Sequence, residues 1–259
     1  MCGICGFNWN DEILVKKMAN EMVHRGPDQH GTFCSDCVSL GHCRLSIIDL
    51  SEHGRQPLTN ENGSIHLVFN GEIYNFQELR KELLDKGHIF QGMSDSEVIV
   101  HAYEEYGIEC ISKLRGMFAF GIWDDIKKSL LLVRDRIGIK PLYYYHKNGK
   151  FIFASEIKAI LQDKNIERKL NYQALYDYLG FEFVSAPETM FKNIYKIPAG
   201  HYLLLRNDNI EIKQYWDLTF KSNSNILSYQ DAVEQQRELL DGAVKSHLIS
   251  DVPLGVCVS

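Results

Sequence analysis

The sequence has neither an apolar run long enough to span a membrane nor a block of basic residues. The apolar run at residues 129–133 has the length of a strand, whereas a spanning helix needs at least about 18 apolar residues. The net charge of −6 is spread over alternating acidic and basic side chains, which excludes a basic track for nucleic acid and a polybasic membrane anchor. These absences favour a small-molecule substrate, with neither nucleic acid nor membrane as a partner.

The sequence also lacks the features of a secreted protein that is stabilised by disulfide bonds. The first residues turn polar after Phe7, so we expect no signal peptide. The seven cysteines are an odd number, and a chain of 259 residues with 45% hydrophobic side chains can bury a core without staples. We therefore expect a cytoplasmic protein with reduced thiols. The sequence leaves open whether it forms a homodimer.

Apolar periodicity predicts helices in the first half of the chain and hairpins after it. Apolar residues at helical spacing predict a helix over residues 11–23 and another over 94–106. A third helix is predicted to begin at the capping-box pattern of residues 75–78. From Gly116 onward, alternating runs and turn residues predict three β-hairpins. These pair residues 117–123 with 129–135, 141–146 with 151–155 through Asn148-Gly149, and 201–206 with 210–216 around Asn207-Asp208-Asn209.

The last part of the sequence has a different pattern, which predicts a second domain. A polar stretch at 221–225 is typical of a linker, a helix runs from Ser228 to about Leu248, and an apolar strand follows at 251–259. A helix and one buried strand cannot make a complete domain. We therefore predict one domain over residues 1–220 and the truncated start of an α/β-type domain over 226–259.

Cys2 follows the initiator methionine, and this position has a chemical use. Because the side chain of Cys2 is small, Met1 can be removed, which leaves Cys2 with a free α-amine. The pKa of such an amine is about 8, so part of the amine is neutral at physiological pH and can act as a base. One residue then supplies both a nucleophilic thiol and its activating base. If Met1 is retained, we expect a blocked amine and an inactive site.

Several segments in a fixed order along the chain form a pattern together: residues 2–6, 24–28, 41–49, 70–75, 94–97, 115–120, 134–144 and 154–158. These segments resemble the class II glutamine amidotransferases, in which the N-terminal residue is the nucleophile. Within that family they are most similar to the asparagine synthetases. The resemblance implies an α+β fold, a four-layer αββα sandwich of two antiparallel sheets with helices on both outer faces.

The resemblance also implies a role for each matching residue of a glutaminase site. Cys2 would be the nucleophile, and the Asn70 side-chain amide and the Gly71 N–H would form the oxyanion hole. Arg44 would pair the α-carboxylate of glutamine, and Asp95 with Glu72 would hold its α-ammonium. Asn70-Gly71 follow an apolar strand at 65–69, so a β-turn fits them as well. The implied glutamine-binding residues are Arg44, Leu45, Asn70, Gly71, Glu72 and Asp95.

The chemistry implied for Cys2 is hydrolysis of glutamine through a γ-glutamyl thioester, which needs no metal or cofactor. Residues 250–259 resemble the strand that opens an ATP-dependent synthetase domain, where Cys257 and Ser259 would contact ATP. That domain would use ATP and Mg²⁺ to activate aspartate for attack by the ammonia. Some relatives amidate other carboxylates, on sugars or peptides, so the acceptor stays open.

Two other interpretations compete with a glutaminase. The Cys-x-x-Cys pairs Cys2/Cys5 and Cys34/Cys37 could hold zinc, although the interval between them exceeds usual zinc-ribbon spacing and zinc would block Cys2. We expect instead that Cys5 is buried on the first strand and that Cys34 and Cys37 flank a turn through Ser35-Asp36, with their oxidation left open. A catalytically silent interaction domain is disfavoured by the presence of Cys2 with its implied partners. No partner pattern that suggests a metal site surrounds His42, His53 or His88.

Overall fold

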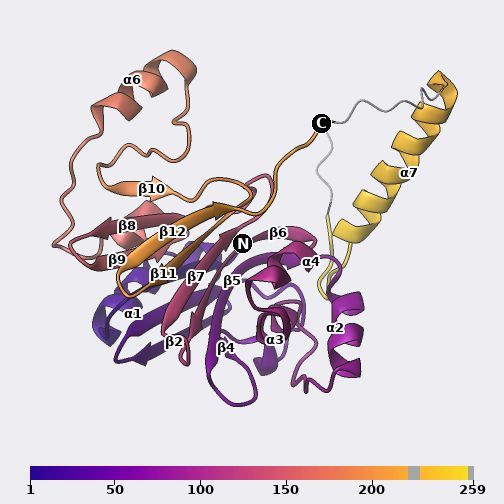
Figure 1. Ribbon diagram of the computed structural model, residues 1–259, viewed down its shortest axis with the longest axis horizontal. Coiled ribbons are helices and arrows are strands. Elements are labelled where there is room, and N and C mark those ends of the chain that lie inside the picture. Colours follow the sequence, from indigo (N-terminus) through magenta and orange to yellow (C-terminus); the bar gives the residue numbers. More distant parts are fainter. Residues whose placement is uncertain (221–227, 256–259) are drawn as a thin grey trace.

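Two six-stranded antiparallel sheets form the centre of the computed structural model, which describes residues 1–220 and 228–255 (Figure 1). The first sheet has the spatial order β10 (Ile194–Lys196), β8 (Tyr143–Lys147), β9 (Lys150–Ala154), β1 (Gly3–Phe7), β3 (Val38–Arg44) and β2 (Gln29–Ser35). The second sheet has the order β12 (Asn209–Gln214), β11 (His201–Arg206), β7 (Ser129–Arg134), β6 (Gly116–Asp124), β5 (Ile65–Ile73) and β4 (Leu58–Thr59).

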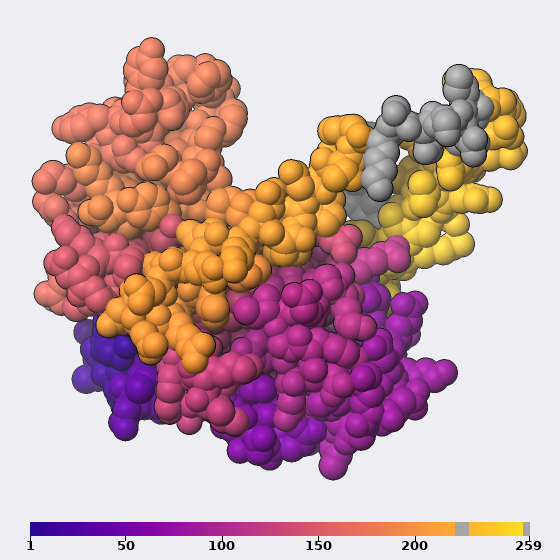
Figure 2. All heavy atoms as spheres, viewed as in Figure 1, coloured from indigo at the N-terminus to yellow at the C-terminus, as the bar shows by residue number. Residues whose placement is uncertain are grey.

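Helices cover the outer face of each sheet, so the predicted four-layer αββα sandwich is confirmed. The first sheet packs against α1 (Glu12–Asn20) and α5 (Ile157–Ile160). The second sheet packs against α2 (Phe76–Asp85), α3 (Glu97–Tyr106) and α4 (Cys110–Lys113). Short 3₁₀ turns occur at Val23–Arg25, Glu52–Gly54 and Gly107–Glu109. Two further helices, α6 (Tyr172–Phe181) and α7 (Tyr229–His247), stand away from the sheets, as Figures 1 and 2 show.

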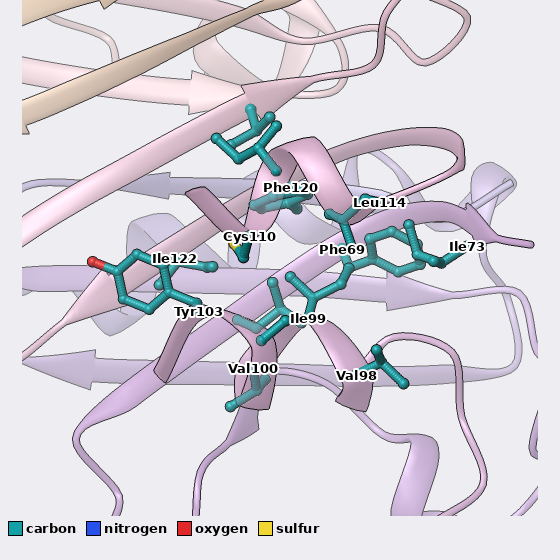
Figure 3. Close-up of a cluster of buried hydrophobic side chains, with 14 of the residues drawn as sticks. Phe69, Ile73, Val98, Ile99, Val100, Tyr103, Cys110, Leu114, Phe120 and Ile122 are labelled. Carbon is teal, nitrogen blue, oxygen red and sulfur yellow. The ribbon is translucent and has the colours of Figure 1, made fainter. Parts of the chain in front are cut away.

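Three apolar clusters fill the spaces between the four layers. Successive side chains of a strand point to opposite faces, so one strand can serve two clusters. Val68 of β5 packs between the sheets, whereas its neighbours Leu67 and Phe69 face the helices. Figure 3 shows the cluster between the second sheet and its covering helices, to which Phe69 and Phe120 of the sheet and Ile99 of α3 belong. The polar residue two positions after Val68, Asn70, therefore also points between the sheets.

The three predicted hairpins are confirmed, and two of them have turns with the expected chemistry. Asn148 and Gly149 have φ of 53° and 75°, and Asn207 and Asp208 have φ of 50° and 60°. Positive φ at both central residues gives the turn whose twist matches that of paired strands. Asn209 belongs to β12 and not to the turn.

Several predicted details are wrong at the ends of elements. The helix predicted over 11–23 ends at Asn20, and after two turn residues a 3₁₀ turn follows at Val23–Arg25. Asn75 does not cap α2, because its side chain bonds to the Lys113 carbonyl and to the Arg115 N–H, each at 2.9 Å. The turn between β2 and β3 lies at Asp36-Cys37, one residue later than predicted, because Ser35 still pairs with Val38.

The helix predicted after Ser228 is confirmed, with the Ser228 hydroxyl accepting the Asp231 N–H at 3.1 Å. The predicted linker at 221–225 lies outside the described residues, as do 256–259 of the predicted final strand. Residues 251–255 form no strand. Asp251 instead binds the loop after β3, donating its N–H to the Ile47 carbonyl at 2.9 Å and accepting the Asp49 N–H at 2.7 Å. Among the helices that the structure describes, none has the length and apolar character to cross a membrane.

Candidate active site

A cavity of about 180 Å³ brings together all the residues to which the sequence assigned glutamine chemistry. They arrive from distant parts of the chain: the start of β1, the end of β3, the second half of β5 and the segment before α3. The residues of this group, which we call the Cys2 pocket, are Cys2, Arg44, Leu45, Asn70, Gly71, Glu72 and Asp95.

Cys2 lies immediately before β1, a central strand of the first sheet, and its position is tightly held. Arg25 Nε donates to the Cys2 carbonyl at 2.9 Å, and the same guanidinium pairs with Glu156 at 3.0 Å. The Cys2 Sγ lies 3.4 Å from the Leu45 nitrogen, close enough to accept its N–H. Leu45 thus contributes a backbone donor to the nucleophile.

Burial raises the pKa of the Cys2 thiol, although the Leu45 N–H opposes the shift. The thiol is therefore neutral at physiological pH and needs a base before it can attack. Met1 precedes Cys2 in this chain, so the Cys2 nitrogen is part of a peptide bond. Met1 lines the same cavity, and the pKa of its α-amine is lowered by burial and by the charges of Lys140 and Arg25. The pocket thus favours a neutral amine beside the thiol.

Among the residues that the structure describes, the Gly71 N–H on the edge of β5 is a free backbone donor, and it lies between two N–H groups that already have hydrogen-bond partners. Alternate residues of an antiparallel strand aim their N–H groups at the same edge. The Phe69 N–H bonds to Gln56 Oε1 at 2.7 Å, and the Ile73 N–H bonds to Asp95 Oδ2 at 2.8 Å. Gly71 lies between them, and Phe118 opposite it directs its own backbone groups to Asp135. The Gly71 N–H therefore faces the cavity and not β6.

Gly71 also shows why the turn considered from the sequence is wrong. β5 continues to Ile73, with Asn70 paired to Ala119 and Gly71 paired to Phe118. A Cβ atom at Gly71 would lie 2.2 Å from the Met117 carbonyl oxygen, so only glycine fits this close approach of β5 to β6. The oxyanion-type donors stand on a strand, which holds them more rigidly than a turn would.

The Asn70 amide is fully buried, yet neither its Nδ2 nor its Oδ1 has a hydrogen-bond partner among residues 1–220 and 228–255. A buried polar group without a partner costs free energy, so such a group commonly serves a ligand. His42 of β3 fixes this part of β5, because its Nε2 lies 2.9 Å from the Phe69 carbonyl. Burial lowers the pKa of His42 to about 4, so the ring is neutral and bridges the two sheets as a donor.

Arg44 lies in the pocket wall, but its terminal nitrogens are already bonded. Nη1 donates to Gln29 Oε1 at 2.7 Å and to the Ser51 carbonyl at 3.2 Å. Nη2 donates to the carbonyls of Ile48, at 3.0 Å, and Asp49. A bidentate contact through Nη1 and Nη2 with the α-carboxylate of glutamine, as expected from the sequence, would displace these oxygens. In this state Arg44 anchors the loop after β3.

Asp95 and Glu72 provide the acidic side of the pocket. Burial raises the pKa of Asp95 to about 7, and the neighbouring Glu72 adds to the shift. Burial also raises the pKa of Glu72, which the Lys140 charge opposes. Two carboxyl groups that lose solvation in one cavity favour a cationic partner such as an ammonium group.

Sequence reasoning assigned no role to two further residues of the cavity wall. Lys140 lies 5% exposed beside Cys2 and Glu72, and burial lowers its pKa. It belongs to the matched segment 134–144, so its position in a motif was a signal that could have found it. Gln56, which bonds to the Phe69 N–H, had no such signal.

The four-cysteine zinc site considered from the sequence is wrong on geometry. Cys2 precedes one end of β1, and the turn that carries Cys37 lies beyond the other end, where Phe7 pairs with Ser39 and Ser39 with Cys34. A strand advances about 3.3 Å per residue, so the two pairs are too far apart to share one ion. Cys5 is buried on β1, as expected, and donates to the Gly41 carbonyl.

Two helix-covered antiparallel sheets, with a cysteine immediately before the first strand, give the chain the fold of the N-terminal-nucleophile hydrolase class. The family described as "Glutamine amidotransferase domain" matches residues 1–216. The chain belongs to this family.

Similar proteins agree with this assignment. The chain is 41% identical over 269 residues to "Asparagine synthetase [glutamine-hydrolyzing] 1" of Bacillus subtilis, which covers 100% of this chain and 42% of that protein. It is 38% identical over 279 residues to "Amidase chry2" of Gibberella zeae, covering 100% and 41%. Among solved structures, glutamine phosphoribosylpyrophosphate amidotransferase from B. subtilis shares the fold with a TM-score of 0.61 at 20% identity, covering 83% of this chain and 49% of that one. The chain thus spans less than half the length of these relatives.

Proposed function

We propose that this domain hydrolyses glutamine to glutamate and ammonia, with Cys2 as the nucleophile once Met1 has been removed. The observation that carries the proposal is the Cys2 thiol in one cavity with two free donors, the Asn70 amide and the Gly71 N–H. The combination suits acyl transfer, because a tetrahedral intermediate places negative charge where such donors converge.

In the first half-reaction the free α-amine of Cys2 takes the thiol proton, and the thiolate attacks the side-chain carbonyl of glutamine. The oxygen becomes negative and is stabilised by Asn70 and Gly71. The C–N bond then breaks, and the leaving nitrogen takes the proton from the α-ammonium and departs as ammonia, which leaves a γ-glutamyl thioester on Cys2. Burial of the thiol supports this assignment, since it favours a neutral thiol before the proton moves.

In the second half-reaction water attacks the thioester carbonyl, and its proton passes to the same amine. The intermediate expels the Cys2 thiolate, which recovers the proton as glutamate leaves. Asp95 and Glu72 hold the α-ammonium of the substrate throughout, and Arg44 supplies positive charge on the side of the α-carboxylate. None of these steps requires a metal ion.

We further propose that the ammonia serves an ATP-dependent synthetase domain, with residues 1–220 as the glutaminase and 226–259 as the start of the second domain. Aspartate, activated with ATP and Mg²⁺, is the default acceptor, as the name of the Bacillus relative suggests. The Gibberella relative is named an amidase, which keeps a different carboxylate acceptor as the alternative. Cys257 and Ser259, expected to contact ATP, lie outside the described residues.

Ammonia release from glutamine by purified protein with a free Cys2 tests the glutaminase proposal. We expect turnover in the wild type and only background release in Cys2→Ala. Cys5→Ala, which removes a buried thiol of the same strand, is the matched control and should retain turnover. Equal activity in wild type and Cys2→Ala would refute Cys2 as the nucleophile, and a wild type that is correctly processed but inactive would favour the silent interaction domain.

A further inference from the structure

A second polar cluster lies on the helix-covered side of the second sheet, away from the Cys2 pocket. Its members come from the loop between β4 and β5, from the segment between α2 and α3, and from one face of α3. One potential ligand atom from each residue lies within 4.8 Å of all the others. We call this the His–Glu cluster; it consists of Glu61, His88, His101 and Glu104.

The cluster has the donor set and spacing of a transition-metal site. Two imidazoles and two carboxylates are ligands that Zn²⁺ accepts in tetrahedral array, with bonds of about 2.0–2.2 Å and hence neighbouring ligand atoms about 3.4 Å apart. His101 Nδ1 lies 3.6 Å from Glu61 Oε1, and His88 Nδ1 lies 3.8 Å from Glu104 Oε2. Closure onto an ion would require movements of less than about an ångström.

His101 supplies an independent sign that a ligand is missing from this cluster. Its side chain is only 2% exposed, and its Nδ1 has no hydrogen-bond partner in the described part of the chain, although it points at Glu61. A neutral imidazole has one N–H and one lone pair. Its Nε2 faces a second carboxylate, Glu97, at 3.7 Å, so one of the two nitrogens must direct a lone pair at a carboxylate oxygen.

His88 repeats this arrangement. Its Nδ1 faces Glu104, and its Nε2 faces Glu105 Oε2 at 3.3 Å. When each ring carries a single N–H, each ring directs a lone pair at a carboxylate oxygen, and a cation bound at that lone pair removes the repulsion between the two. When both Nδ1 atoms bind one cation, the Nε2–H of His101 can donate to Glu97 and the Nε2–H of His88 can donate to Glu105. Such hydrogen bonds orient metal-binding histidines in proteins.

We propose that the His–Glu cluster binds one divalent transition-metal ion of the Zn²⁺ type, with Glu61, His88, His101 and Glu104 as ligands and Glu97 and Glu105 as the carboxylates that orient the histidines. The ion would join the β4–β5 loop, the segment before α3 and α3 itself. Glu61 and Glu104 have side chains 34% and 30% exposed, which gives the ion access from solvent. The site is structural and separate from glutamine hydrolysis.

Zinc titration of the untagged, chelator-stripped full chain tests this proposal. We expect one equivalent of Zn²⁺ to bind and to raise the melting temperature. Glu61→Gln and Glu104→Gln should each weaken the affinity by at least about tenfold, since even loss of an orienting partner commonly costs that much. These side chains are partly exposed, so the amides should leave the fold intact. Wild-type-like zinc affinity in both variants would overturn the proposal, as would the absence of zinc binding at micromolar concentration.

Two control variants exclude other zinc sites. Glu12→Gln makes the same chemical change at an exposed position on α1, on the other outer face of the molecule, and should bind zinc like the wild type. Cys34→Ser with Cys37→Ser removes the thiol pair at the β2–β3 turn and should also leave the affinity unchanged. Loss of the bound equivalent in this double variant would assign the zinc to the thiols and refute the His–Glu cluster. As a second readout, Co²⁺ should give a four-coordinate visible spectrum that the Glu61→Gln variant lacks.

Discussion

The Cys2 pocket and the His–Glu cluster both contain buried polar atoms that no group in residues 1–220 and 228–255 satisfies, but their chemistry is opposite. The pocket presents free donors, the Asn70 amide and the Gly71 N–H, near a neutral thiol. The cluster presents excess acceptors, because imidazole nitrogens face carboxylates on both sides. Free donors suit a developing negative charge and excess acceptors suit a cation. Unsatisfied groups therefore indicate the kind of ligand as well as its location.

The largest effect in this comparison should come from blocking the α-amine of Cys2. A cleavable N-terminal fusion that leaves Cys2 first after cleavage provides both forms of one protein. We expect the uncut form to release ammonia about 100- to 10,000-fold more slowly, the range contributed by a general base. Zinc affinity should be the same in both forms. Equal rates of ammonia release before and after cleavage would show that another group activates the thiol.

Asn70→Ala should have the next largest effect. Loss of one oxyanion donor lowers kcat by about 100- to 1,000-fold, because the interaction is made mainly in the transition state. KM for glutamine should change much less, and steady-state kinetics separate the two. Asn75→Ala is a suitable control, because it makes the same chemical change just after β5, at an amide that bonds to Lys113 and Arg115 and lies outside the pocket wall. A kcat unchanged in Asn70→Ala would remove this residue from the mechanism.

Much of the site could be predicted because the matched motifs carry its residues. Cys2, Arg44, Asn70 and Asp95 are far apart in the sequence, and only the family's order connects them. The local details could not be predicted in the same way. The commitment of Arg44 to the Ile48 and Asp49 carbonyls depends on how a loop folds back, which no residue pattern specifies.

The fold shows the same division between local and long-range information. The hairpin turns at Asn148-Gly149 and Asn207-Asp208 follow from local backbone preferences, and both formed. The capping box at Asn75 did not form, because a tertiary contact with the end of α4 took its side chain. The His–Glu cluster was missed because its ligands come from three segments. His101 and Glu104, three residues apart on α3, were the only local part of the pattern, and His88 alone showed none.

Asp95 should give the pocket a smaller, pH-dependent effect. Its pKa is raised to about 7, and the carboxylate form is the one that binds the α-ammonium of glutamine. Below that pKa the group becomes neutral, so kcat/KM should fall by about tenfold for each pH unit. Asp95→Asn should have a lower kcat/KM at high pH and should lose this dependence, whereas Asp28→Asn should keep it. An unaltered pH profile in Asp95→Asn would assign the titration to another group.

The smallest effect on catalysis should come from removing metal. Stripping the protein with a chelator should lower its melting temperature, since a ligand that binds only the folded state stabilises it. Ammonia release at a temperature well below unfolding should stay unchanged, because no step at Cys2 uses a metal. Restoring the melting temperature of Glu61→Gln should require at least about tenfold more Zn²⁺ than the wild type requires. Loss of ammonia release on stripping, with the fold intact, would show that the two sites are coupled.

The most direct test of the account is where an electrophilic glutamine analogue attaches, read by intact-mass and peptide mass spectrometry. With Met1 removed, we predict one equivalent of covalent label, located on Cys2, and protection from labelling by excess glutamine. The form that retains a residue before Cys2 should remain unlabelled over the same time. Label on another residue, or equal labelling of Cys2 in both forms, would contradict the account of Cys2 as a nucleophile activated by its own α-amine.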